Sequence, residues 1–268
     1  MPVTEVRGAS INHEVTGSGE PLLLLPCLGA DLSCWGFQVP GYSERYTCIS
    51  VDLPGVGLSP PPEGAASTIR YADEMAALLD ALGIASTHVA GVSLGSAVAT
   101  HLAARHPERV RSLALHSTWD VTDAYMATVL DGWDTLVRAA PTVADAVVTG
   151  IFPWAFTAAM YAERPDVLEE FGAIARSRPP QSVAGFDAGA QAVRGHDARE
   201  ALGRIAAPTL VTYGALDALT STRFAPAMTE GIRDSRLHVF EGLSHAGFNE
   251  DPDRFTAVTL EFMASVGG

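Results

Sequence analysis

The stretch that most constrains this chain is the run Val89-Ala90-Gly91-Val92-Ser93-Leu94-Gly95-Ser96. A short apolar segment, typical of a buried strand, leads into Gly-x-Ser-x-Gly, and helix-forming residues follow to about His106. The chain must therefore turn from strand to helix within a few residues, which we expect to hold Ser93 in a strained backbone conformation. Gly91 and Gly95 have no Cβ, so the strand and the helix can approach each other closely.

Such a turn gives Ser93 and its neighbour Leu94 two chemical capabilities. The Ser93 hydroxyl projects from the turn, where a base can reach it, and the Leu94 N–H lies at a helix N-terminus, free to donate to a developing oxyanion. This pattern is typical of a nucleophile elbow, the turn that carries the attacking serine of a hydrolytic enzyme. For the motif alone, the alternative interpretation is a structural serine in a tight turn.

Apolar strands alternate with amphipathic helices along most of the chain. The apolar run 22–25, bounded by prolines, has the length expected for a strand buried on both faces. The segment 71–82 has apolar residues at helical spacing and stops at Gly83. Strands are predicted at 4–7, 10–15, 21–26, 47–52, 87–92, 110–116, 208–213 and 236–240, and the longer helices at 71–82, 93–106, 222–231 and 252–266. This alternation predicts an α/β fold, a doubly wound, mostly parallel sheet of eight strands with helices on both faces.

A serine nucleophile needs a base that takes its proton and an acid that orients the base. In doubly wound sheets such residues lie in loops at the carboxyl ends of the strands. Asp217 follows the predicted strand 208–213, and His245 follows the predicted strand 236–240. The order Ser93, Asp217, His245 is the one that accompanies the elbow motif. The sequence therefore predicts these three as a catalytic triad.

Three further residues near strand ends are weaker candidates for the site. Asp120 is the second candidate acid, because it follows soon after the predicted strand 110–116. His116 ends that strand and could line the site. Asp52 ends a strand as well, but Asp52-Leu53-Pro54-Gly55 is typical of a structural turn.

A second oxyanion donor should come from the loop after the predicted strand 21–26. The backbone N–H of Leu28 is the best placed, whereas Pro26 has no N–H and cannot serve. Cys27, in the same loop, is expected to line the pocket as a small apolar residue. A role for Cys27 as nucleophile is not expected, since the elbow already holds Ser93.

The sequence pattern changes between residues 119 and 198. This segment shows no clear strand and is helix-like, with aromatic side chains scattered through it. We therefore expect a core of 1–118 and 199–268, interrupted by a helical insertion at 119–198. The aromatics favour a largely apolar substrate pocket, although packing of the insertion onto the core would also account for many of them. The basic residues of this segment are Arg138, Arg164, Arg176, Arg178 and Arg194. One of them could pair with a substrate carboxylate, and the alternative for each is a position on the protein surface.

Charge and cysteine content argue against several classes of protein. The chain has 31 acidic and 17 basic residues, a net charge of −14. Nucleic acids and anionic membranes favour a basic patch, so we expect neither as a partner. The three cysteines contain no Cys-x-x-Cys pair, which disfavours a disulfide framework or a zinc site. With no secretory signal or membrane span visible, we expect a cytoplasmic protein that acts on a small molecule. Assembly into a homo-oligomer stays open.

Together these motifs resemble the α/β-hydrolase fold family, in its form with a helical lid, and in particular the group of esterases, enol-lactonases and carbon–carbon bond hydrolases. The resemblance spans nearly the whole chain and rests on 22–29, 52–59, 91–95, 208–217 and 242–248. It implies Ser93 as nucleophile, His245 as base and Asp217 as acid. It also implies the backbone N–H groups of Leu28 and Leu94 as oxyanion donors, and the segment 119–198 as the lid.

Two positions depart from the family pattern. Pro26-Cys27 stands where His-Gly is usual, and Val56 stands where a histidine is frequent. The first departure lies beside the expected oxyanion hole, so we expect its side chains to reshape or narrow that pocket.

The resulting hypothesis is a serine hydrolase that cleaves a carboxylic ester or lactone through an acyl-enzyme, with no metal and no organic cofactor. Its pocket is expected to include Cys27, Trp119, Trp154 and Phe248. The same triad could instead support carbon–carbon bond hydrolysis, cofactor-free perhydrolysis or a biosynthetic cyclisation. A ligand-binding protein without turnover is a further alternative, because a fold does not fix a function.

Overall fold

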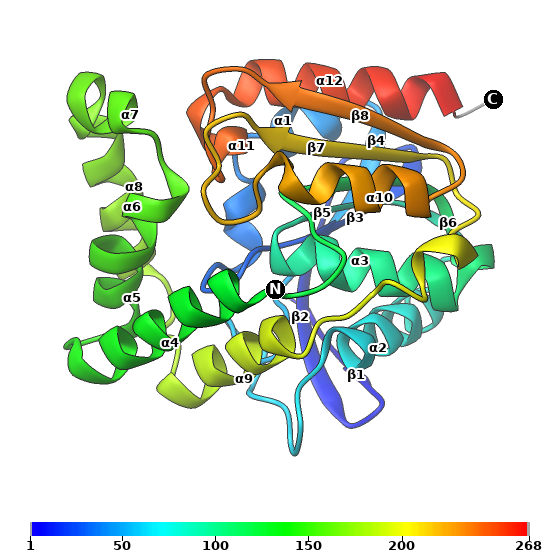
Figure 1. The fold of residues 1–268 in the computed structure, drawn as a ribbon. Helices are drawn as coiled ribbons and strands as arrows, with labels where there is room; N and C mark the ends of the chain where they lie inside the picture. Colours follow the sequence, from blue (N-terminus) through cyan, green and yellow to red (C-terminus); the bar gives the residue numbers. More distant parts are fainter. Residues whose placement is uncertain (1, 267–268) are drawn as a thin grey trace.

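The computed structural model describes residues 2–266 and is built around one eight-stranded sheet with the order β1-β2-β4-β3-β5-β6-β7-β8 (Figure 1). The strands are β1 Val3–Val6, β2 Ala9–Thr16, β3 Glu20–Leu25, β4 Tyr46–Val51, β5 Thr87–Val92, β6 Val110–His116, β7 Thr209–Gly214 and β8 Ser235–Phe240. From β4 to β8 the neighbouring strands run parallel, and β2 joins the sheet antiparallel to both β1 and β4. The predicted doubly wound, mostly parallel sheet is confirmed.

Helices cover both faces of this sheet (Figure 1). On one face lie α2 Thr68–Ala81, α3 Leu94–Arg105 and α10 Ala225–Gly231, and on the other lie α1 Val39–Tyr42 and α12 Pro252–Val266. A strand covered on both faces can expose no side chain, which is why the run Leu22 to Leu25 is completely buried. The short α11 Gly247–Glu250 precedes α12.

Local sequence signals set the helix ends. The side chain of Ser67 accepts a hydrogen bond from the Arg70 N–H, which caps the start of α2. Past its end, Gly83 has a φ of 70°, a left-handed conformation that glycine adopts without a Cβ clash. The predicted helices at 71–82 and 252–266 are both present, the second with the bounds expected.

Between β6 and β7 the chain forms a group of helices beside the carboxyl ends of the central strands, on the left in Figure 1. We call residues 119–198 the insertion. Its helices are α4 Ala124–Ala139, α5 Val143–Ala146, the π-helix Val147–Ile151, α6 Phe152–Ala155, α7 Ala158–Glu163, α8 Pro165–Ser177 and α9 Val183–Arg194. An isolated antiparallel β-bridge pairs Val121 with Asp197, so the two ends of the insertion lie side by side.

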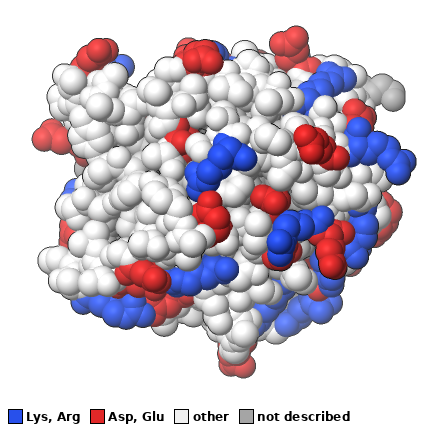
Figure 2. Space-filling view, viewed as in Figure 1, with Lys and Arg blue, Asp and Glu red and all other residues white. Residues whose placement is uncertain are grey.

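The surface is mixed in charge. On the face shown in Figure 2, acidic side chains are interspersed with basic ones. Within residues 2–266, none of the helices combines the length and the apolar character needed to span a bilayer.

Candidate active site

Ser93 occupies a sharp turn between β5 and α3. Its φ of 52° and ψ of −120° lie outside the regions that ordinary residues favour. The turn is held by the Ser93 N–H, which donates to the His116 carbonyl at 2.9 Å. A Cβ on Gly91 would lie 2.4 Å from the Gly95 carbonyl oxygen, and one on Gly95 would lie 2.2 Å from the Leu25 oxygen. Both glycines are therefore required for this close approach.

Asp217 and His245 meet at the ends of β7 and β8. The His245 Nδ1 donates to Asp217 Oδ2 at 2.9 Å. Three further donors fix the carboxylate: the Leu219 N–H at 2.8 Å, the Thr220 N–H at 3.0 Å and the Thr220 hydroxyl at 2.9 Å. Each oxygen of Asp217 is thus held in place by hydrogen bonds.

The electrostatics of this pair favour the charged carboxylate. Burial opposes ionisation of Asp217, but the positive charge of His245 and the surrounding hydrogen bonds hold the pKa of the carboxyl below its ordinary value. Burial likewise opposes protonation of His245, yet the Asp217 carboxylate raises the imidazole pKa above its ordinary value. An imidazole in this position accepts a proton more readily than a free histidine does.

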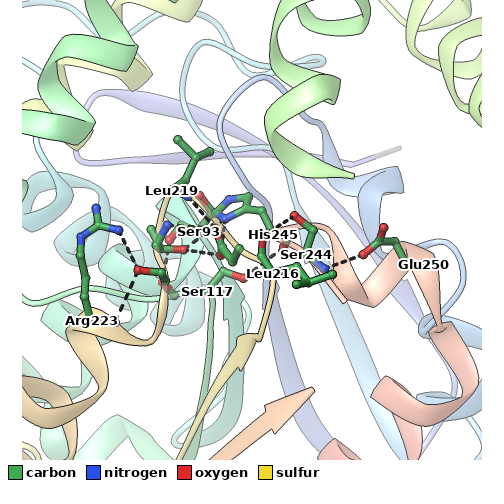
Figure 3. A network of polar contacts seen from close by, with 12 residues as sticks. Ser93, Ser117, Leu216, Leu219, Arg223, Ser244, His245 and Glu250 are labelled. Carbon is green, nitrogen blue, oxygen red and sulfur yellow. Dashed lines mark hydrogen bonds and ion pairs between the residues drawn. The ribbon is translucent and has the colours of Figure 1, made fainter. Parts of the chain in front are cut away.

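The loop that carries His245 is anchored from both sides (Figure 3). From the core, the Ser117 hydroxyl donates to the His245 carbonyl at 3.1 Å. From the insertion, the Ala155 carbonyl accepts from the Ala246 N–H at 2.8 Å. The Glu250 carboxylate accepts two N–H groups, that of Ser244 at 2.7 Å and that of Thr157 in the insertion at 2.7 Å.

Ser93 and His245 line one cavity of about 450 Å³. The core contributes the loop after β3 and the loops that carry Thr220 and His245. The insertion contributes a mainly apolar wall, which includes Trp119, Met126, Val129, Leu130, Trp133, Val147, Ile151, Phe152, Phe156, Phe171 and Ile174. Charged side chains on the wall are Glu170 and Arg178. A small, largely apolar molecule would fit, with its reactive group against Ser93.

The two predicted oxyanion donors are Leu94 and Leu28. Leu94 is the first residue of α3, so its N–H has no acceptor within the helix. Leu28 lines the cavity in the loop after β3. The side chains of both leucines point toward Gly189 of α9, since a Cβ there would lie 2.6 Å from Leu28 Cδ1 and 3.6 Å from Leu94 Cδ2. The side-chain ends of both leucines therefore pack against α9.

The predicted pocket residues divide into two groups. Cys27, Trp119 and Phe248 line the cavity, but Trp154 does not, so that prediction is wrong. Trp154 instead packs edge to face against Tyr125 of α4, with ring centroids 6.3 Å apart. On a helix, side chains two positions apart point in opposite directions.

In α6, it is Phe152 that faces the cavity, together with Ala155 and Phe156 one turn further along. The sequence alone could not give the rotation of so short a helix.

Cys27 is a free thiol in the loop beside the site. The neighbouring Cys34 side chain lowers the pKa of Cys27, burial raises it, and the positive charges of His245 and Arg178 lower it. The net effect is a pKa below the ordinary value, whereas burial raises the pKa of Cys34 well above it. Cys27 is therefore the more easily ionised thiol of the cavity.

Asp120 and His116 take no part in the triad. Asp217, and not Asp120, bonds to His245. His116 does not line the cavity with Ser93, because its ring points into the opposite face of the sheet. There its Nδ1 lies 2.8 Å from the Thr212 hydroxyl, and its centroid is 4.3 Å from that of Phe255 in α12. Burial lowers the His116 pKa to about 3, so the ring is neutral at physiological pH.

Asp52 holds a turn of the core. Its carboxylate accepts from the N–H groups of Leu32 and Leu58 and from the Asn12 amide, as expected for a structural turn. Acidic side chains do not gather into a metal site either. In the part of the chain that the structure describes, no group of three or more His, Cys, Asp or Glu side chains is placed to hold a metal ion.

Sequence reasoning missed three residues of the site: Thr220, Ser117 and Glu250. Thr220 lies three residues after Asp217, a spacing typical of a side chain that bonds back to an acidic residue. Ser117 directly follows β6 and has a φ of 50°. No sequence signal marks Glu250, because one of its two partners, Thr157, comes from a distant part of the chain.

Comparisons with known proteins agree with the fold. The sequence profile of the alpha/beta hydrolase fold family matches residues 20–252. A pimeloyl-[acyl-carrier protein] methyl ester esterase of Aeromonas hydrophila is 31% identical, over 95% of this chain and 99% of its own. A 3-oxoadipate enol-lactonase of Acinetobacter baylyi is 27% identical, over 93% and 91%. The crystal structure of the enol-lactonase from Burkholderia xenovorans superposes with a TM-score of 0.89 at 25% identity, covering 98% of this chain and 100% of that one.

Proposed function

The chain belongs to the α/β-hydrolase fold family and is a hydrolase that acts on ester bonds. We propose that it cleaves a carboxylic ester or lactone of a small, largely apolar substrate through an acyl-enzyme. Ser93 is the nucleophile, His245 the general base and Asp217 the residue that orients the base.

In the first half of the reaction, the Ser93 hydroxyl attacks the ester carbonyl while His245 takes its proton at Nε2. Asp217 accepts from Nδ1, which leaves Nε2 free to act as the base and stabilises the imidazolium. The tetrahedral intermediate then collapses, and His245 gives the proton to the departing alkoxide. Water attacks the acyl-enzyme by the same route in reverse, which releases the carboxylic acid and restores Ser93.

The negative oxygen of each tetrahedral intermediate needs donors that are already in place. We assign this role to the N–H groups of Leu28 and Leu94, which lie on the two segments that meet at the elbow. Removing one such donor typically costs about 3 kcal/mol of transition-state stabilisation.

One observation carries the proposal: the hydrogen-bonded pair of Asp217 and His245 opens onto the same cavity as the strained Ser93. The apolar wall contributed by the insertion is consistent with a lid that covers the substrate and excludes water. The cavity volume of about 450 Å³ favours a small substrate.

The test combines a serine-directed fluorophosphonate with a short p-nitrophenyl ester. We expect covalent labelling at Ser93, found by peptide mass spectrometry, and ester turnover that is lost in His245→Ala. Ser93→Ala is the control that should take up no label. Labelling without turnover of esters or lactones would reject ester cleavage in favour of another bond type, and absence of labelling would reject the activated serine.

A further inference from the structure

The insertion contains five arginines, and one of them differs from the rest. Four are engaged at the surface by acidic partners: Arg138 with Asp187, Arg164 with Asp166, Arg176 with Asp145, and Arg194 with Asp131 and Asp134. Arg178 also lies beside an acidic side chain, Asp31, but unlike the other four it lines the cavity that holds Ser93 and His245. It also lines a smaller adjoining pocket of about 80 Å³.

The backbone of Arg178 is held firmly. It directly follows α8, and Pro179-Pro180 come next. A following proline restricts a residue to extended conformations, and Arg178 has a φ of −71° and a ψ of 163°. Three residues further along, the Gln181 amide donates to the Gly55 carbonyl of the core at 3.0 Å. The guanidinium is therefore presented from a fixed position.

The guanidinium itself has no hydrogen-bond acceptor among residues 2–266. Its Nε lies 3.3 Å from Asp31 Oδ1, an ion pair without hydrogen-bond geometry, and the side chain is 22% exposed. The Asp31 oxygen is already used, because it accepts from the Ser33 N–H at 3.0 Å and the Ser33 hydroxyl at 2.7 Å. An arginine has five N–H donors, and none of those of Arg178 makes a hydrogen bond to another of the described residues.

Arg178 lies near the reacting groups. Its partner Asp31 is three residues after Leu28, so their Cα atoms are at most about 11 Å apart. The other charged wall residue, Glu170, lies in α8, eight residues earlier in the chain, a separation of about 12 Å along the helix direction. An anion at Arg178 would therefore lie close to the ester site and away from Glu170.

From these observations we propose that Arg178 binds a free carboxylate on the substrate, and that the natural substrates are esters or lactones that also carry a carboxylate a short carbon chain away. This inference rests on the proposed hydrolysis at Ser93. A planar carboxylate matches the two-pronged guanidinium edge. The neighbouring Asp31 carboxylate repels a phosphate dianion more strongly than a singly charged carboxylate, so the carboxylate is the better match.

The first experiment compares matched substrates. Monomethyl esters of dicarboxylic acids of four to eight carbons are each paired with the methyl ester of the monocarboxylic acid of equal length, and hydrolysis is followed by acid release. We expect wild-type kcat/KM to favour the half-ester at one or two chain lengths. Arg178→Gln should reduce this preference on the order of 10- to 100-fold, and Arg178→Lys should retain part of it.

Arg176→Gln is the matched control, because it removes the same charge two residues away at a side chain paired with Asp145. It should leave the preference unchanged. If Arg178→Gln and Arg176→Gln alter the preference equally, or if the wild type shows none, the carboxylate site is rejected.

A second experiment separates the two proposals, because binding does not require turnover. Calorimetry measures monomethyl adipate binding to Ser93→Ala and to the double variant that also carries Arg178→Gln. At least tenfold weaker binding by the double variant supports the carboxylate site, whether or not the wild type hydrolyses esters. Absence of ester hydrolysis in the wild type would reject only the proposed hydrolysis. Equal binding by the two variants overturns the inference even if neutral esters are hydrolysed.

Discussion

The two sides of the cavity are built by different forces. On the core side, Asp217 and His245 are fixed by hydrogen bonds to backbone and side-chain groups. On the insertion side, the wall is held by packing, for example Phe152 against Phe156 with centroids 5.1 Å apart and Phe156 against Phe171 at 5.7 Å. Hydrogen bonds define direction and distance closely, whereas apolar packing tolerates changes of shape. The core side thus suits chemistry, and the insertion side suits substrate choice.

The largest effect should come from breaking the core side at its centre. Ser93→Ala removes the attacking oxygen, and we expect kcat/KM for esters to fall by about 10⁴-fold or more. The fold should persist, which circular dichroism and thermal unfolding can check. Substantial turnover by this variant would contradict the assignment of the nucleophile.

Asp217→Asn should have the next largest effect, with kcat about 10²- to 10⁴-fold lower, since the amide favours the wrong imidazole tautomer. The pH profile adds a second readout. The reaction needs neutral His245, whose pKa is raised by Asp217, so wild-type kcat/KM should fall as pH decreases through a value above the ordinary histidine pKa.

Without the carboxylate, the imidazole pKa drops and the inflection should move to lower pH. An inflection that stays in place would show that another group titrates.

Glu250→Gln tests the link between the two sides. The amide can accept only one of the two N–H groups that the carboxylate holds, and its own NH₂ would face the other. We expect the His245 loop to shift and kcat to fall about tenfold, because small misplacements of a catalytic group are costly. Glu241→Gln, an exposed change at the start of the same loop, is the control and should leave kcat unchanged.

Changes on the insertion side should alter selectivity more than rate. Phe152→Ala widens the cavity, so we expect the preference for bulkier acyl groups over acetyl to rise about fivefold, measured with a series of p-nitrophenyl esters. Trp154→Ala, two positions along the same helix but facing Tyr125, should leave that preference unchanged. Equal shifts in both variants would mean that the insertion acts through its stability and not through the shape of the cavity.

The smallest effect is expected at Cys27. Its thiol lines the cavity and has a lowered pKa, yet the mechanism gives it no chemical step. Cys27→Ala should change kcat/KM by only about twofold and should remove the site that iodoacetamide labels first. Loss of activity in Cys27→Ala would show that the thiol takes part.

The sequence was informative wherever a pattern is local. Apolar runs predicted the strands of the sheet, because a strand buried on both faces must be apolar along its length, and β6 has the bounds expected. Helical spacing predicted the helix that the structure shows as α2. The order of Ser93, Asp217 and His245 relative to the strand ends was enough to predict that the last two would meet, since parallel strands end at one edge of a sheet.

Where contacts join distant segments, the sequence was silent. The Glu250 carboxylate joins the core to the insertion through the Thr157 N–H, and the outward rotation of Trp154 depends on how α6 packs. The position of Arg178 in the cavity wall depends on how the segment after α8 meets the core. Local residue patterns were sufficient to predict the sheet, the elbow and the candidate triad, because periodicity and turn chemistry are encoded by neighbouring residues. Which side chains face the cavity could be read only from the folded chain, because packing of segments far apart in the sequence sets that orientation.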